Sequence, residues 1–237
     1  MRPQILLTLL LTTAAFPQAR PTTFLLEDTT IVAGTAGQFE PSQHQYCLAA
    51  LKAGTPACLV FSTALFGDTN RYLTLLPIAN FAHFDSGQYA ASGLTVEEDH
   101  AQTGSPAAQT HQSVIALEPE LSFTHAPNNQ RPLNLFLEYH LRPGTLDAFL
   151  ALVRSNQLPA ARKAAVPAFE VFRTLVGASP DRVFVVYRLD SYAQLDRYKE
   201  PDSGEWRDFA SKDILSSTSF VVRYRPEISA NPNDPTS

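Results

Sequence analysis

Apolar and polar positions alternate along Leu133–Leu141, and a pattern with helical spacing follows. The alternating run is rich in Leu, Phe and Tyr, which predicts a β-strand. Pro143-Gly144 predicts a turn, and Thr145 is a suitable helix cap. Apolar residues then recur at positions i, i+3, i+4 and i+7 of a predicted helix, namely Leu146, Phe149, Leu150 and Val153.

The rest of this segment predicts three more strands and a second helical region. In chain order these are strands at Phe169–Leu175 and Arg182–Arg188, helices at Ser191–Tyr198 and Glu205–Leu215, and a strand at Ser219–Arg225. The short turn between the first two strands predicts a hairpin, and Ser191 is the expected helix cap. Pro159 is expected to kink or split the first helix. The order β-α-β-β-α-β is that of a ferredoxin-like unit.

The same pattern occurs earlier in the chain, at a spacing of 111 residues. Between residues 24 and 85, 14 of 62 positions are identical to the later copy, against roughly 4 by chance. This alignment places Glu27 on Glu138 and Arg71 on Arg182. A shift of four residues between Ser86 and Gln112 then superposes two Pro-Glu-(Leu/Ile)-Ser segments. The strands of the first copy are expected near residues 23–32, 58–65, 71–77 and 112–118.

The repeat predicts the domain organisation. Ferredoxin-like repeats are expected over residues 23–123 and 134–230, joined by a linker at 124–133 and followed by a disordered tail at 231–237. A four-stranded antiparallel sheet with helices on one face needs a cover for its other face. We therefore predict an α+β fold in which the two sheets pack face to face as an intramolecular α/β barrel. Because the partner sheet lies in the same chain, a monomer is expected.

The two Pro-Glu-(Leu/Ile)-Ser segments are expected to end the last strand of each repeat. Pro119 and Pro226 cannot donate a ladder hydrogen bond, so each stops its strand. Glu120 and Glu227 are then expected to face solvent and to have no catalytic role.

The N-terminus has the composition of a secretory signal. Arg2 precedes a mostly apolar run, Ile5–Phe16, and small residues follow. We expect residues 1–19 to be removed on export, to the periplasm or the medium, which leaves no integral membrane segment in the mature chain. The net charge is −5 with no basic block, so nucleic acid is not an expected partner.

Export makes a disulfide between Cys47 and Cys58 the favoured prediction, because disulfides persist in oxidising compartments. Two separately buried thiols are the alternative. The chain has no nucleotide-, phosphate- or zinc-binding motif, and its six histidines are scattered, so no cofactor and no metal site is predicted.

The segments "LFLEYHLRPGTLDAFLALV" and "FEVFRTLVGASPDRVFVVYRLDSYAQLD" resemble the dimeric α/β-barrel superfamily, which includes antibiotic-biosynthesis-monooxygenase-like proteins. The features that carry the resemblance are Arg142-Pro143-Gly144 after a strand and a hairpin leading to Leu195-Asp196. The "RPEIS" segment resembles exported bacterial members whose activities are mostly unknown. The resemblance implies the fold, but the superfamily contains cofactor-free oxygenases, haem-handling enzymes, isomerases and proteins without known activity.

In enzymes of this superfamily, strand residues that face the helices can line a substrate cleft. Glu138 and His140 point to the same sheet face and are the candidate catalytic pair for proton transfer. The alternative, which the residues favour, is a structural ion pair of Glu138 with Arg173, Arg188 or Arg223.

Four residues are candidate ligand contacts, namely Asn156, Gln157, Tyr187 and Trp206. The first two are polar where the helical stripe should be apolar, and Trp206 follows a loop. The small residues that follow, Ala160, Ala161 and Ala164, can leave room for a ligand under the helix or let helix and sheet pack closely, and close packing is the favoured explanation. The favoured function is a non-enzymatic exported module that binds a small apolar ligand or a partner. A cofactor-free monooxygenase-like enzyme acting on a small aromatic substrate and a purely structural fold are the alternatives.

Overall fold

The computed structural model describes residues 22–86, 107–125, 131–177, 181–198 and 201–232. The predicted signal peptide, His100, most of the predicted tail and residues 126–130 of the predicted linker lie outside this part of the chain.

The described part of the first half contains four strands that form the barrel and two helices. In order these are β1 (Thr23–Ile31), α1 (Ala36–Lys52), β2 (Leu59–Leu65), β3 (Arg71–Pro77), α2 (His83–Ser86) and β4 (Ala107–Leu117). The strand positions agree with the predicted ones, although β4 begins five residues earlier. A 3₁₀ turn at Pro119–Leu121 and a short strand, β5 (Phe123–Thr124), follow.

The second half repeats this order. Its elements are β6 (Leu133–Leu141), α5 (Leu146–Leu152), a π-helical turn (Val153–Gln157), α6 (Leu158–Lys163), β7 (Ala168–Val176), β8 (Arg182–Leu189), a 3₁₀ helix (Tyr192–Arg197), α7 (Gly204–Asp213), β9 (Ile214–Tyr224) and a 3₁₀ turn (Pro226–Ile228).

Two boundaries in the second half differ from the prediction. The helix predicted at 205–215 ends at Asp213, and β9 starts at once. Ser191 makes no side-chain cap, whereas the Ser203 hydroxyl accepts a hydrogen bond from the Trp206 amide and caps α7. The β-branched and hydroxyl residues after Asp213 pair well in a strand, which explains the longer β9.

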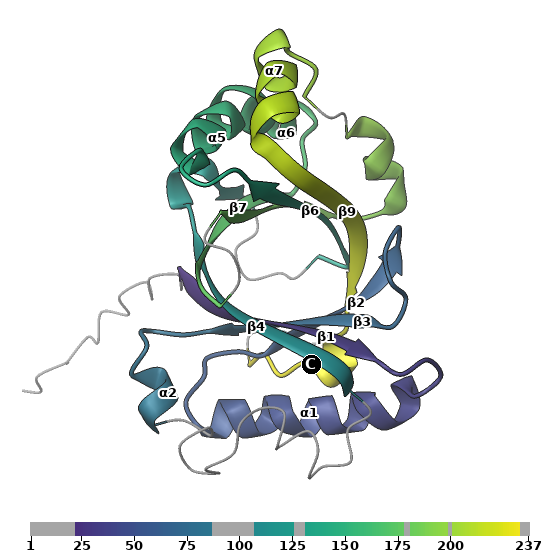
Figure 1. The fold of residues 1–237 in the computed structure, drawn as a ribbon. Coiled ribbons are helices and arrows are strands. Elements are labelled where there is room, and N and C mark those ends of the chain that lie inside the picture. The colour runs from purple at the N-terminus through teal and green to yellow at the C-terminus, as the bar shows by residue number, and fades with distance from the viewer. Residues whose placement is uncertain (1–21, 87–106, 126–130, 178–180, 199–200, 233–237) are drawn as a thin grey trace, which may run out of the picture.

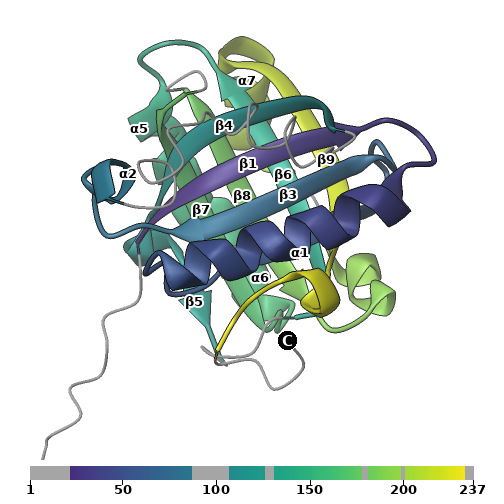
Figure 2. The same cartoon turned by 90° about the horizontal axis from the view of Figure 1, so that it is seen from below.

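The strands form one closed antiparallel barrel. Each half has the sheet order β4-β1-β3-β2 or β9-β6-β8-β7, and the halves join where β2 pairs with β9 and β4 pairs with β7. Helices α1 and α2 cover one side of the barrel, and α5, α6 and α7 cover the opposite side (Figures 1 and 2). The predicted α+β fold and intramolecular barrel are confirmed. The two sheets also share hydrogen bonds at both edges, because the last strand of each half pairs with the second strand of the other.

Side chains alternate between the inside of the barrel and the helix layers. The inside is filled by an apolar cluster with many aromatic rings, whose aromatic members are Phe61, Phe136, Phe172, Phe184, Phe220 and Tyr224. A second cluster lies between the first sheet and α1, and a third lies between the second sheet and helices α5, α6 and α7. The molecule therefore has a filled barrel with one helix-covered core on each side.

The register of the repeat differs from the 111-residue alignment at its beginning. Thr30 pairs with Arg71, and His140 pairs with Arg182, so the first strands are related by 110 residues and the hairpins by 111. The π-helical turn at Val153–Gln157 lies between the two regions, and a π-bulge holds one extra residue in a helix. The alignment of Glu27 with Glu138 is therefore wrong, and Asp28 is the counterpart of Glu138.

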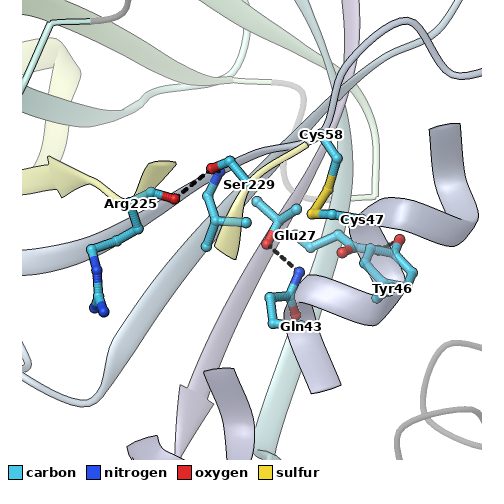
Figure 3. Close-up of a disulfide and its surroundings, with 9 residues drawn as sticks. Glu27, Gln43, Tyr46, Cys47, Cys58, Arg225 and Ser229 are labelled. Carbon is cyan, nitrogen blue, oxygen red and sulfur yellow. Dashed lines mark hydrogen bonds between the residues drawn. A yellow bond between two sulfur atoms is a disulfide. The ribbon is translucent and has the colours of Figure 1, made fainter. Parts of the chain in front are cut away.

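The two Pro-Glu-(Leu/Ile)-Ser segments lie against the opposite half of the chain. Ser229 Oγ accepts a hydrogen bond from Val60 N and donates to the Arg225 carbonyl (Figure 3). Ser122 Oγ likewise accepts from Val171 N and donates to the Glu118 carbonyl. Each serine thus continues the pairing of β2 or β7 after proline has ended the preceding strand.

Charged residues in or directly before these segments pair with helices of the opposite half. Arg225 pairs with Glu40 of α1 at 2.8 Å, and Glu120 pairs with Arg154 of the π-helical turn at 3.0 Å. Glu120 and Glu227 are both largely exposed, at 79% and 55%. We call residues 118–122 and 225–229 the two clasps, because each ends a strand of its own half and also binds the opposite half.

A disulfide joins Cys47 of α1 to Cys58, the residue before β2 (Figure 3). Both residues are fully buried. Cys58 also exchanges two backbone hydrogen bonds with Ala230. The disulfide therefore fixes α1 to the point at which the C-terminal clasp docks.

Candidate functional site

Four charged side chains meet inside one end of the barrel. The strands alternate in direction around the barrel, so β1 and β6 end at the same side at which β3 and β8 begin. Asp28 and Glu138 lie near the ends of β1 and β6, and Arg71 and Arg182 are the first residues of β3 and β8. We call these four residues the charge cluster.

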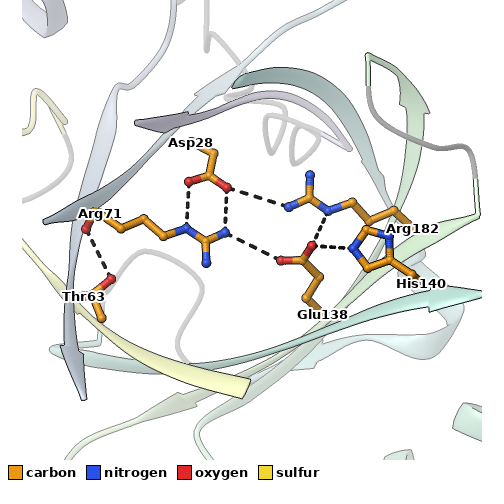
Figure 4. Close-up of polar contacts among 6 residues, drawn as sticks. All are labelled: Asp28, Thr63, Arg71, Glu138, His140 and Arg182. Carbon is orange, nitrogen blue, oxygen red and sulfur yellow. Dashed lines mark hydrogen bonds and ion pairs between the residues drawn. The ribbon is translucent and has the colours of Figure 1, made fainter. Parts of the chain in front are cut away.

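The charge cluster has approximate two-fold symmetry (Figure 4). Within the halves, Arg71 Nη2 lies 2.6 Å from Asp28 Oδ2, and Arg182 Nε lies 2.6 Å from Glu138 Oε1. Between the halves, Arg71 lies 3.6 Å from Glu138, and Arg182 lies 3.8 Å from Asp28. All four side chains are 9–17% exposed, and their formal charges cancel.

The charge cluster rests on the aromatic filling of the barrel. The Arg71 guanidinium lies 4.3 Å from the ring centre of Phe220, and that of Arg182 lies 4.7 Å from the ring centre of Phe184. At these distances the cations are attracted to the ring faces. Each arginine is thus bound both by an aromatic ring face and by carboxylates.

These partners keep Glu138 ionised. Burial by itself would raise the pKa of the Glu138 carboxyl, but the hydrogen bond and charge of Arg182 oppose this, with help from His140 and Arg71. The net result is that the pKa of Glu138 lies below its ordinary value. A carboxylate with a lowered pKa is a poor proton acceptor at neutral pH.

The candidate catalytic pair is in contact. His140 Nε2 lies 2.9 Å from Glu138 Oε1, and the His140 side chain is 40% exposed. Both residues face the inside of the barrel, which places them on the opposite face of β6 from the helices. The position of His140 is occupied by Thr30 in the first half, so the histidine is not repeated.

The ion-pair partners expected for Glu138 are wrong. Arg173 pairs with Glu118 at 2.6 Å, Arg188 pairs with Glu170 at 2.8 Å, and Arg223 is exposed next to Tyr192. Arg71 and Arg182 bind Glu138 instead, and sequence reasoning missed them. The 110-residue register, which sets Asp28 opposite Glu138, was the signal that could have identified this cluster.

Glu27 has a different environment from Glu138. It faces α1, where Tyr46 donates to its carboxylate at 2.7 Å. Gln112 of β4 donates to the same carboxylate at 2.9 Å. Glu27 is 1% exposed, so these hydrogen bonds compensate its burial. It is a fixed connection between β1, α1 and β4.

Three of the four candidate ligand residues surround Tyr139 on the helix-facing side of β6. Gln157 Nε2 donates to the Tyr139 hydroxyl at 3.1 Å, and the Trp206 ring lies 6.1 Å from the Tyr139 ring. Burial raises the pKa of the Tyr187 hydroxyl, and its neighbour Tyr139 raises it further. Asn156 is not in this group, because it bonds to Leu152 and Ser155 of its own helix.

Gln157 is fully buried, and its Oε1 atom has no hydrogen-bond partner in the described part of the chain. An unsatisfied buried amide oxygen is costly and calls for a physical explanation. The residue lies in the π-helical turn, which turns it toward β6. The corresponding layer of the first half has Gln43 bonded to Thr74 instead.

A groove of about 650 Å³ opens on the outer surface between α5 and α7. Ala148, Ala151, Leu152 and Ser155 line it from the side of α5, and Glu205, Asp208, Phe209, Lys212 and Asp213 line it from α7. Phe209 also contacts Phe149 of the underlying core. None of the four candidate ligand residues lines this groove, so sequence reasoning missed its walls.

Within the described residues, no group of three or more His, Cys, Asp or Glu side chains is placed to hold a metal ion. In the same part of the chain, no helix is both long and apolar enough to cross a membrane.

No protein-family model matches the chain, and no curated protein matches its sequence. Solved structures do match its fold. An anthrone oxidase-like protein superposes with a TM-score of 0.66 at 15% identity, over 87% of this chain and 92% of that one. The chain has the dimeric α/β-barrel fold.

Two bacterial proteins of this fold are similar over their whole length. A candidate monooxygenase from Lactobacillus acidophilus gives a TM-score of 0.57 at 10% identity, over 89% of this chain and 96% of that one. A candidate monooxygenase from Fusobacterium nucleatum gives 0.57 at 8% identity, over 89% and 95%. At such identities the shared feature is the dimeric α/β barrel, and a shared fold does not determine the activity.

Proposed function

We propose that this dimeric α/β-barrel chain is a non-enzymatic module that binds a small apolar molecule. The observation that carries the proposal is that β6 separates the candidate catalytic pair from the groove. Glu138 and His140 point into the barrel, whereas the groove between α5 and α7 lies outside it, beyond the helix layer. A proton-transfer pair must lie within hydrogen-bond reach of its substrate.

The interior of the barrel supports the same conclusion. The space next to Glu138 is occupied by Arg71, Arg182 and the rings of Phe184 and Phe220. The carboxylate is fully engaged by cations, and its lowered pKa suits a structural charge better than a general base. We therefore assign Glu138 to the stability of the barrel.

The groove supports ligand binding by its size and its lining residues. Ligand pockets of proteins commonly hold about 300–1,000 Å³ and are mainly apolar, with a few polar groups. The lining of the groove includes alanine, leucine and phenylalanine side chains, and Ser155, Lys212 and three carboxylates supply the polar contacts. A partner protein that inserts an apolar side chain is the macromolecular form of the same interaction.

We further propose that the chain is exported to the periplasm or the medium. The apolar segment behind Arg2 supports this, and so does the Cys47–Cys58 disulfide, since such bonds persist in oxidising compartments. The closed barrel supports a single chain as the folding unit, because no sheet face is left for a partner to cover.

Purification from the native source followed by mass spectrometry for bound small molecules tests the function. A ligand should be recovered, and its binding to the purified protein should be lost when Ala151→Phe fills the groove. Ala49→Phe on the exposed face of α1 is the matched control and should bind normally. A ligand that binds equally well to the Ala151→Phe variant would reject the groove. A chain that never carries a molecule would favour a purely structural fold.

A cofactor-free monooxygenase-like enzyme is the second candidate, and the unpartnered Gln157 Oε1 beside Tyr139 and Trp206 favours it. An aromatic cluster with a buried polar group suits a small aromatic substrate. Anthrone is a suitable probe, since anthrone and O₂ give anthraquinone and water. The enzyme reading expects oxygen uptake that Gln157→Leu abolishes and Gln43→Leu leaves intact. No uptake above the uncatalysed rate would reject it.

A further inference from the structure

The N-terminal part of β9 has a free edge. β9 pairs with β6 from Ile214 to Arg223, but it pairs with β2 only from Val221 to Tyr224. In the described chain, residues 214–220 therefore have a strand partner on one side only. Figure 1 shows β9 leaving the end of α7 and reaching β2.

This edge has only one of the usual protections against pairing, a bulge at its outer end, where Leu215 is skipped in the pairing of β9 with β6. Leu215, Ser216, Ser217, Thr218 and Ser219 are all exposed, and Leu215 is 62% exposed. Natural edge strands are commonly blunted by lysine, proline or a bulge. The five residues contain no charge and no proline. Their backbone groups are therefore open to another strand.

An exposed apolar hairpin lies at the inner end of the edge. Phe66 is 73% exposed and has a φ of 63°, and a side chain at Gly67 would come within 3.0 Å of Phe220. The second half has Gly177 at the position of Phe66, with a φ of 99°. A bulky residue in the left-handed region is unusual, and strain of this kind is often found at functional sites.

We propose that the free edge of β9 pairs with the same edge of a second copy of this chain. Antiparallel pairing about a two-fold axis at Ser217 sets Leu215 opposite Ser219 of the second copy. Phe66, whose neighbour Gly67 lies against Phe220, then lies next to Leu215 of the second copy, and the contact occurs twice. The arrangement explains why Phe66 and Leu215 are apolar and exposed at the two ends of one edge.

Charge also favours a second copy as the occupant. Around a two-fold axis each side chain near the centre meets its own counterpart, so any charge there would repel itself. The segment from Leu215 to Ser219 is uncharged and made of small hydroxyl residues beyond Leu215. The proposal revises the expected monomer to a dimer of closed barrels and is independent of the proposed ligand.

The test is the solution mass of the purified protein across a series from micromolar to millimolar concentration, by light scattering or sedimentation. Wild type should reach the dimer mass. Ser217→Asp and Ser217→Lys should each raise the dissociation constant about tenfold or more, because like charges then face each other. An equal mixture of the two variants should dimerise again, since opposite charges meet at the axis.

Gln109→Asp, at the equivalent exposed edge of β4, is the control and should dimerise as wild type does. Circular dichroism should show that all variants are folded. A wild type that stays monomeric would overturn the proposal and leave the edge to a strand from a different protein. Dimers that persist in Ser217→Asp would overturn it as well, by placing the contact elsewhere.

Discussion

At the scale of single residues, the most informative feature is the charge cluster. Four buried charges in a barrel are expensive, and each is tolerated because two opposite charges or an aromatic face lie next to it. Replacing a complete buried ion pair can be harmless, but removing one member leaves an uncompensated charge. The cluster therefore makes each of its members sensitive to single substitution.

Arg182→Met is expected to lower the free energy of unfolding by about 3 kcal/mol, because it leaves the buried Glu138 without its main partner. Urea unfolding followed by circular dichroism measures the change. Arg154→Met is the control, because its partner Glu120 is 79% exposed and such surface pairs contribute about 0–1 kcal/mol. Equal losses in both variants would contradict a special role for the cluster.

The lowered pKa of Glu138 predicts acid sensitivity. Its folded-state pKa lies below the ordinary value of 4.5, so the unfolded state takes up a proton more readily. The stabilisation is therefore complete above pH 4.5 and is lost as the pH falls through the folded-state pKa. As the pH is lowered from above 4.5 to below it, the free energy of unfolding should fall more steeply in wild type than in Glu138→Gln. The control, Glu120→Gln, should keep the wild-type slope.

At the scale of elements, the clasps and the π-helical turn define how the two halves fit. The repeated Pro-Glu-(Leu/Ile)-Ser segment ends a strand in one half and pairs with a strand in the other. The π-helical turn adds one residue to the second helix and turns Gln157 toward β6. The clasps preserve the pseudo-symmetry of the two halves, and the π-helical turn breaks it.

Ser122→Ala and Ser229→Ala should each destabilise the protein by about 1–3 kcal/mol, because each leaves a strand amide without its acceptor. The two effects should be nearly additive, since the clasps lie on different strands. Thermal and urea unfolding measure them. Ser211→Ala, at an exposed residue of α7, should be close to neutral. Neutral clasp variants would mean that water replaces the serine hydroxyls.

Removing the Cys47–Cys58 disulfide should cost about 2–3 kcal/mol, because it closes a short loop of the unfolded chain. The Cys47→Ala/Cys58→Ala variant should unfold at lower urea concentration than the oxidised wild type. Reduced wild type should behave like the variant. If reduction left the free energy of unfolding unchanged, the disulfide between α1 and the C-terminal clasp would not contribute to stability.

The sequence predicts most elements correctly, because their apolar periods are regular. The strand at Leu133–Leu141 is predicted to the residue, since its pattern and the turn after it agree. The π-helical turn was not predicted, because one extra residue leaves the helical stripe nearly unchanged. That residue hid the equivalence of Asp28 and Glu138, and with it the charge cluster. The groove is lined by exposed alanines of α5 and by side chains of α7, two helices that only the folded chain brings together.

At the scale of the whole molecule, the barrel joins the halves through hydrogen bonds on both sides. The pairings β2–β9 and β4–β7 are contacts between halves, and so are both clasps. Neither half can close its own sheet. The apolar filling of the barrel is shared as well, with Phe61 from one half beside Tyr224 from the other. The barrel is therefore one cooperative unit built from two similar halves.

This architecture predicts a single unfolding transition for both halves. Trp206 is the only tryptophan, and its fluorescence reports the helix layer of the second half. Hydrogen exchange of the β1 and β3 amides reports the first half. The two probes should give the same free energy of unfolding, because the shared pairings must break together. Exchange in β1 and β3 at a clearly lower free energy would show that the first half opens alone. The pairings between halves would then be weaker than those within them.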